Sequence, residues 1–171
     1  DGVLYDSNGR LMRTTYAIKS KSSGGTKQSQ RYWYYASTPS GSDEQSIIER
    51  LPAGEVERLV LTGLKNHLND QSWLTLKIRM AVDLDPSSIT KILQTAGSLR
   101  NQIADKGEHS DAQYLNGLID RIDLSKGQFC VRLDLGALQK PEEAMLPISA
   151  AFGVPFQKRQ NGRAKPIIIA P

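Results

Sequence analysis

The chain has 171 residues, 39% of them hydrophobic and 6% aromatic, with a net charge of +4, which allows one domain or two small lobes with a modest core. The single cysteine, Cys130, excludes an internal disulfide, cannot by itself hold a structural zinc ion, and favours a reducing, cytoplasmic compartment. No apolar run approaches the roughly 18 residues that span a bilayer, and a signal peptide is not recognisable, so no membrane partner is expected.

The positive charge is concentrated at the two ends of the chain. Residues 1–35 carry six Lys or Arg and two acids, residues 158–171 carry four Lys or Arg and no acid, and residues 36–157 carry twelve basic and sixteen acidic side chains. If the two ends meet in the fold, they form one cationic face of net charge +8. The chain begins at Asp1, without an initiator Met and within an apparent strand, and we expect it to be part of a longer protein.

The N-terminal residues predict a basic β-ribbon. Residues 3–5 and 11–18 flank Asp6-Ser7-Asn8-Gly9, whose Asn-Gly pair tolerates the positive φ angles of a tight hairpin turn. Residues 20–30 are polar and contain paired glycines, which predicts a mobile loop, and the aromatic residues 32–35 predict a third strand. A linker is expected over residues 38–43.

The middle of the chain is predicted to be helical. Apolar residues recur at three- and four-residue steps over residues 53–68, after Pro52, which predicts a helix. Residues 73–80 fit alternate strand positions nearly as well as a short helix, and we favour the helix. Asp85 and Pro86 predict the N-cap and first position of a helix that runs to about residue 104, and a further helix is predicted from Ser110 or Asp111 through residue 119.

The C-terminal residues predict strands. Apolar and polar side chains alternate over residues 129–135, residues 146–156 suggest a strand broken by Pro147 and Pro155, and the turn at residues 160–163 precedes an apolar run at 167–169. The predicted fold is therefore α+β, with an antiparallel ribbon in residues 1–50, a helical segment in 51–119 and C-terminal strands or a hairpin in 120–171 that can pack with the ribbon as one unit.

Catalytic and cofactor-binding patterns have simpler explanations. His67 and His109 are the only histidines, and neither lies near Cys130 in the sequence, so a buried thiol is favoured over a Cys-His nucleophile pair. Residues 23–27 lack the order of a phosphate-binding P-loop. Neighbouring acids such as Asp83 and Asp85 are better explained by helix caps and solvated faces. We predict no catalytic residue, no metal and no cofactor.

The basic ribbon is instead suited to duplex DNA, because Lys and Arg neutralise phosphates and a two-stranded ribbon fits the major groove. Strand alternation predicts that Trp33 and Tyr35 face the core, which leaves Tyr32 and Tyr34 as packing or sugar contacts. A second basic cluster flanks the turn at 160–163, where an ordinary solvated turn is a comparable explanation. The predicted contacts are Arg10, Arg13, Lys19, Lys21, Lys27, Arg31, Tyr32 and Tyr34 in the ribbon, and Lys158, Arg159, Arg163 and Lys165 in the second cluster.

Five segments carry a resemblance to a known family. They are residues 2–12 (GVLYDSNGRLM), 31–37 (RYWYYAS), 51–57 (LPAGEVE), 118–124 (LIDRIDL) and 154–159 (VPFQKR). The chain resembles the C-terminal, recombinase zinc-ribbon region of large serine site-specific recombinases, which include phage integrases and resolvase-like transposon proteins. The resemblance implies binding of attachment-site DNA, contacts with other recombinase subunits through inserted helices, and a catalytic serine in a separate N-terminal domain.

The resemblance also implies a zinc site that this chain lacks. Such ribbons commonly carry a Cys-x-x-Cys knuckle and a second cysteine pair, whereas Asp6-Ser7-Asn8-Gly9 stands at the knuckle and no cysteine follows Tyr35 within the ribbon. We therefore expect a zinc-free ribbon held by its turn and core. A protein-interaction module without strong DNA affinity remains the alternative function, and a hydrolase is a weaker third.

Overall fold

The computed structural model describes residues 2–23, 26–37, 50–103, 117–139, 147–160 and 166–169, with the backbone alone at 21–23, 26–28, 157–160 and 166–169. Helices and strands both occur, which confirms the α+β class. The strands are β1 (Leu4–Tyr5), β2 (Met12–Ser23), β3 (Thr26–Ser37), β4 (Arg50–Pro52), β5 (Ile119–Ser125), β6 (Gln128–Asp134), β7 (Ser149–Pro155), β8 (Gln157–Gln160) and β9 (Pro166–Ile169). The helices are α1 (Ala53–Asn69), α2 (Gln71–Ala81), α3 (Pro86–Gln102) and the 3-10 turn η2 (Leu135–Leu138).

The described strands form three sheets. The largest has the order β1-β5-β6-β7, in which β1 pairs in parallel with β5 and the other pairs are antiparallel. A second sheet has the order β2-β3-β4, and β8 pairs with β9. The first strand of the chain therefore belongs to the same sheet as the C-terminal strands, and the second and third form a separate ribbon.

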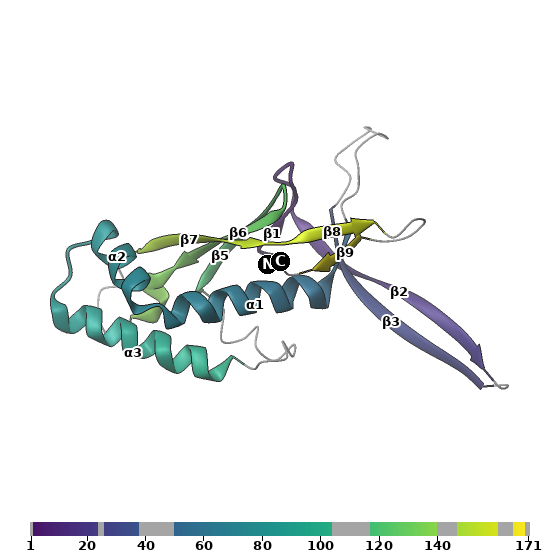
Figure 1. Cartoon of the computed structure of the whole chain (residues 1–171), viewed down its shortest axis with the longest axis horizontal. Coiled ribbons are helices and arrows are strands. Elements are labelled where there is room, and N and C mark those ends of the chain that lie inside the picture. The colour runs from purple at the N-terminus through teal and green to yellow at the C-terminus, as the bar shows by residue number, and fades with distance from the viewer. Residues whose placement is uncertain are drawn as a thin grey trace.

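The core lies between the four-stranded sheet and the helices (Figure 1). The predicted helix at 53–68 is confirmed as α1, whose apolar stripe, including Leu64, is buried. In α3 the Asp85 side chain accepts hydrogen bonds from the Ser87 and Ser88 backbone N–H groups, and Pro86 follows at the first helical position, as predicted. The segment at 73–80, for which we favoured a helix, is helical as α2.

Strict alternation explains why β6 and β7 fit this core. In both strands buried residues alternate with exposed or half-buried ones, and the buried Phe129, Val131 and Phe152 face the helices. Alternation in the sequence predicted β6, and Pro155 ends β7. The Asp134 side chain accepts from the Gly136 and Ile148 backbone N–H groups, and so fixes the turn into η2.

The most prominent feature of the shape is the β2–β3 ribbon, which projects from one end of the body, away from α2 and α3 (Figure 1). Residues 20–30 were predicted to be a loop, and this prediction is wrong for residues 20–23 and 26–30, while residues 24 and 25 lie outside the described residues. Both strands continue, with Ser20 opposite Ser29 and Ser23 opposite Thr26. Backbone hydrogen bonds hold the two strands together whatever their side chains. Because residues 20–30 are polar, their sequence contains no hydrophobic period that would predict these strands.

One helix prediction also needs correction. The helix predicted to end at residue 119 does not include Leu118 or Ile119, because Leu118 lies in a turn after Gly117 at a φ of 88° and Ile119 begins β5. The start of that predicted helix, the linker at 38–43 and the turn at 161–163 lie outside the described residues. Strands β8 and β9 flank that turn, in agreement with the predicted hairpin.

Candidate nucleic-acid interface

The β2–β3 ribbon is a long antiparallel pair with an unbroken register, from Met12 opposite Ser37 to Ser23 opposite Thr26. Twelve residues per strand correspond to a length of roughly 40 Å at about 3.4 Å per residue. Among the described residues, only those at the base of the ribbon gain a third strand, where β4 pairs with residues 34–36. The outer part is thus a two-stranded arm with two faces.

The arm has a single sign of charge. From residue 7 to residue 37 the sequence contains six Lys or Arg, the Arg10 of the turn included, and no Asp or Glu. The side chains of Arg13, Lys19 and Arg31 are exposed. Lys21 and Lys27 occupy ribbon positions whose backbone is described. The arm therefore presents a positive field that no acid of its own strands offsets.

Residues that lie opposite each other share a face of the ribbon, and this divides the arm into two surfaces. We call the first the Lys19 face; its residues are Arg13, Thr15, Ala17, Lys19, Gln30, Tyr32, Tyr34 and Ala36. We call the second the Trp33 face; its residues are Thr14, Tyr16, Ile18, Ser20, Ser29, Arg31, Trp33 and Tyr35.

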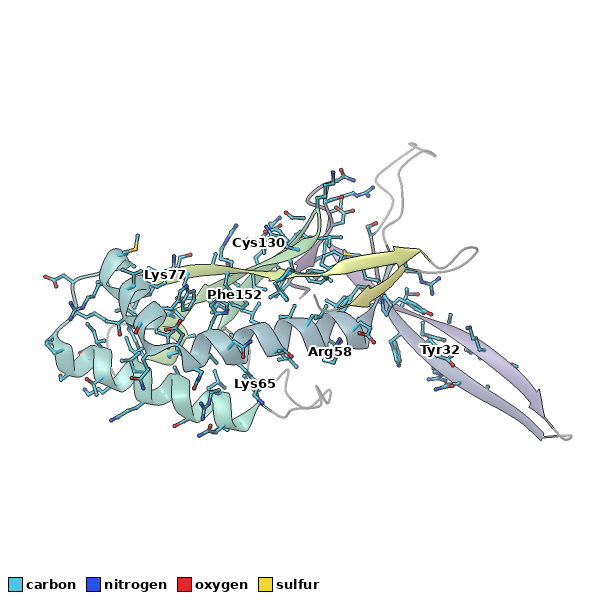
Figure 2. All side chains as sticks on the ribbon, viewed as in Figure 1. Tyr32, Arg58, Lys65, Lys77, Cys130 and Phe152 are labelled. Atoms are coloured by element: carbon cyan, nitrogen blue, oxygen red, sulfur yellow. The ribbon has the colours of Figure 1, made fainter. Side chains whose placement is uncertain are left out.

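The Lys19 face is polar and cationic. The Lys19 Nζ lies 5.3 Å from the centroid of the Tyr32 ring, and the Tyr32 hydroxyl donates to Gln30 Oε1 at 2.8 Å. Figure 2 shows Tyr32 on the projecting part of the ribbon. These contacts hold an ammonium and a phenol side by side on the arm, in a position to meet a phosphate and a sugar.

At the base of this face the structure adds a cation that the sequence reasoning missed. Arg50 of β4 pairs with Ala36, which is also opposite Arg13, so the two arginines flank Ala36 on the same face. The Arg50 guanidinium lies 4.1 Å from the centroid of the Tyr34 ring, and Tyr34 is only 7% exposed. Of the two roles predicted for Tyr34, the structure supports packing. A three-residue strand such as β4 has too few positions to show a period.

The Trp33 face changes from covered to exposed along its length. At the base, Tyr35 is packed against the core and its hydroxyl donates to Glu57 Oε1 of α1 at 2.9 Å. Burial raises the pKa of Tyr35, and the charge and hydrogen bond of Glu57 raise it further. Farther out, Trp33 is 44% exposed. The prediction that Trp33 faces the core is therefore wrong, although it shares a face with Tyr35, because Trp33 lies beyond the covered base.

Arg10 is engaged by the turn at the root of the ribbon. Asp6 Oδ1 accepts from the backbone N–H groups of Asn8 at 2.9 Å and Arg10 at 2.8 Å, and Oδ2 pairs with Arg10 Nε at 2.7 Å. Gly9 supplies the positive φ of 76°. The Arg10 side chain is only 18% exposed. Arg10, which was predicted to contact DNA, is instead bound to Asp6 and stabilises the turn.

The second basic cluster is described only in part. Lys158 and Arg159 lie in β8, whose side chains are not described, and Arg163 and Lys165 lie outside the described residues. Strand β9, the partner of β8, contacts β4 at the base of the arm, where Figure 1 also places both strands. The backbone of β9, in the C-terminal basic segment, thus lies beside the strand that pairs with β3 at the base of the ribbon.

The chain has no match among protein-family models, curated proteins or solved structures. The candidate interface is therefore defined by the residues and geometry of this chain alone.

The histidine and the cysteine that the structure describes, His67 and Cys130, lie apart from each other. The His67 ring stacks on Phe152 at 4.1 Å between centroids and meets the edge of Trp73 at 4.8 Å. Cys130 is next to Val131, the residue opposite Phe152, so alternation places it on the other face of the sheet, as Figure 2 also shows. His67 and Cys130 therefore do not form a nucleophile pair, and His109 lies outside the described residues.

Asp85 and Asp123, two of the acidic residues that the structure describes, form local contacts. Hydrogen bonds from Ser87 and Ser88 hold the pKa of Asp85 well below its usual range. Asp123 is bound by Arg121 at 2.8 Å and lies 3.9 Å from Arg132. Within the described ranges, no three His, Cys, Asp or Glu side chains gather into a group that could hold a metal ion. None of the helices described is long and apolar enough to cross a membrane.

Proposed function

We propose that this chain binds duplex DNA through the β2–β3 ribbon, as the C-terminal part of a large serine site-specific recombinase that recognises attachment-site DNA during integration. The observation that carries the proposal is the projecting, acid-free arm with exposed Arg13, Lys19 and Arg31. Cations of this kind neutralise phosphates and release counterions, which gives affinity for any duplex.

The dimensions of the arm support the same proposal. The major groove of B-DNA is about 12 Å wide and admits a two-stranded ribbon, so an arm of this length can lie in it while the body remains outside. Arg50, at the base, extends the basic surface of the arm toward the body. Contacts there would position the protein along the backbone of the duplex.

The Asp6 turn supports the link to the recombinase family. The resemblance places a zinc-binding knuckle at residues 6–9, and here the Asp6 carboxylate closes the same turn through Asn8 and Arg10. A carboxylate bonded to two backbone N–H groups and a guanidinium can take over the structural part of a metal site. We assign this chain no catalytic step, because the family's catalytic serine belongs to another domain.

Reversal of charge on the arm tests the proposal. We expect the double variant Arg13→Glu and Arg31→Glu to bind a labelled duplex at least about ten-fold more weakly at about 0.1 M salt, with a flatter salt dependence. Fluorescence anisotropy over a salt series measures both quantities. A matched variant, Arg79→Glu and Lys91→Glu, changes the net charge equally on exposed positions of α2 and α3. Equal losses of affinity in both variants would contradict a specific role for the arm.

One observation favours a second candidate, a protein-interaction module. Leu76 and Met80, four residues apart on α2, are both exposed, and such a pair can form a contact with another subunit. Sedimentation at several protein concentrations, beside the DNA titration, separates the two candidates. Self-association without affinity for DNA would favour the module, and DNA binding by a monomer would favour the arm.

A further inference from the structure

The outer part of the Trp33 face is an exposed aromatic surface on a projecting element. Tyr16 is 49% exposed, Ile18 is 55% exposed and Trp33 is 44% exposed. The rings of Tyr16 and Trp33 lie 5.3 Å apart across the two strands, and the Arg31 guanidinium is 5.3 Å from the Tyr16 ring. Two rings are thus in contact, with a cation beside them and Ile18 on the same face, where α1 no longer covers the ribbon.

Charge and size decide between the partners that such a surface suits. A second copy of the arm would bring its own cations against these cations, with no acid in either ribbon. The exposed apolar surface is also small, on the order of 100 Å² per side chain, whereas a stable protein interface buries about 800 Å² on each partner. A polyanion with small apolar groups satisfies both conditions, and duplex DNA is such a partner.

We infer that the Trp33 face lies on the floor of the major groove and contacts the methyl groups of thymine; this inference rests on the proposed function. The C5-methyl of thymine is the apolar group that the major groove presents, and the minor groove lacks it. Ile18 and the rings of Tyr16 and Trp33 cover these methyl groups, and Arg31 reaches hydrogen-bond acceptors on the same floor. Arg13 and Lys19, on the other face, extend past the ribbon edges toward phosphates through their long stems.

Polymers that differ only in this methyl group test the inference. The intact chain is titrated with poly(dA-dT) and with poly(dA-dU), which lacks the thymine methyl. We expect tighter binding to poly(dA-dT), by about four-fold for each methyl group buried. The double variant Ile18→Ser and Trp33→Ser, which keeps only Tyr16 of the three side chains, is expected to lose most of this preference. Control variants are Leu76→Ser with Met80→Ser, which keeps the preference, and Lys19→Gln, which weakens binding to both polymers by the same factor.

A second readout reports the face directly. The chain has two tryptophans, so in a Trp73→Phe background the fluorescence of Trp33 alone is followed. We expect quenching on addition of poly(dA-dT), together with the rise in anisotropy that reports binding. Binding of both polymers with equal affinity, or binding without a change in Trp33 fluorescence, would overturn the inference and leave the proposed function standing. Absence of binding to either polymer at low salt would overturn the proposed function, and the inference with it.

Discussion

Replacement of Gly63 with alanine is expected to lower the free energy of unfolding by about 1–3 kcal/mol. A Cβ at this position would lie 2.6 Å from Val154 Cγ2 and 3.1 Å from Phe152 Cε2, on the strand that α1 packs against. Both neighbours are buried in the core and cannot move aside cheaply. The clash is expected to outweigh the roughly 1 kcal/mol that alanine gains over glycine within a helix.

The matched control is Gly97→Ala in α3. A Cβ added to Gly97 meets no atom within 4 Å, so this variant is expected to be more stable than the parent by up to about 1 kcal/mol. Urea unfolding followed by circular dichroism gives both values. Stabilisation of both variants would show that α1 does not approach β7 as closely as the structure indicates.

The second large effect is expected for Asp6→Ala, at about 1–3 kcal/mol of destabilisation. The side chain of Asp6 is fully buried, and its removal leaves the backbone N–H groups of Asn8 and Arg10, and the Arg10 guanidinium, without their acceptor. Asp120→Ala is the control, because its contact with Arg132 is an exposed pair at 4.0 Å and such pairs contribute little. Comparable destabilisation of the two variants would show that Asp6 does not organise the turn.

The same carboxylate gives the effect a pH dependence. Burial raises the pKa of Asp6, but the hydrogen bonds from Arg10 and Asn8 and the charge of Arg10 outweigh it, and the pKa lies below its ordinary value of 3.8. The folded state therefore binds fewer protons than the unfolded state, and stability falls as the pH drops through this pKa. The difference in stability between the parent and Asp6→Ala should be full at neutral pH and should shrink below about pH 4. A constant difference over this range would exclude an ionised Asp6 as its source.

The sequence predicted elements well where hydrophobic burial follows one clear period. In α1 and β6 the apolar side chains recur at helical and strand spacing because each element buries one face. The outer arm has no such signal, since its strands face solvent on both sides and Ser20, Ser29 and their neighbours are polar. Backbone pairing of that kind depends on the partner strand, which a local pattern does not contain.

The candidate site was predictable to a similar degree. The cations of the ribbon could be found from the sequence, because charge is read directly from residue type. Alternation gave the shared face of Trp33 and Tyr35 but not their different exposures, which depend on how much of the ribbon the body covers. The ion pair of Arg10 with Asp6 and the position of Arg50 across Ala36 from Arg13 are products of tertiary structure.

Removal of the outer arm tests the central claim most directly. In the variant, residues 17–32 are replaced by Asn-Gly, which joins Tyr16 to Trp33, its direct partner across the ribbon, through a two-residue turn. This deletion removes four cations, Lys19, Lys21, Lys27 and Arg31. The measurement is the binding of duplex DNA over a salt series, with the melting temperature of the body followed in parallel.

We predict that the shortened protein stays folded and that its slope of log affinity against log salt is smaller by about 0.9 for each phosphate that the arm no longer neutralises. Its affinity at about 0.1 M salt should fall by at least about a hundred-fold. An unchanged slope and an unchanged affinity in a folded variant would contradict the assignment of the β2–β3 ribbon as the DNA-binding element.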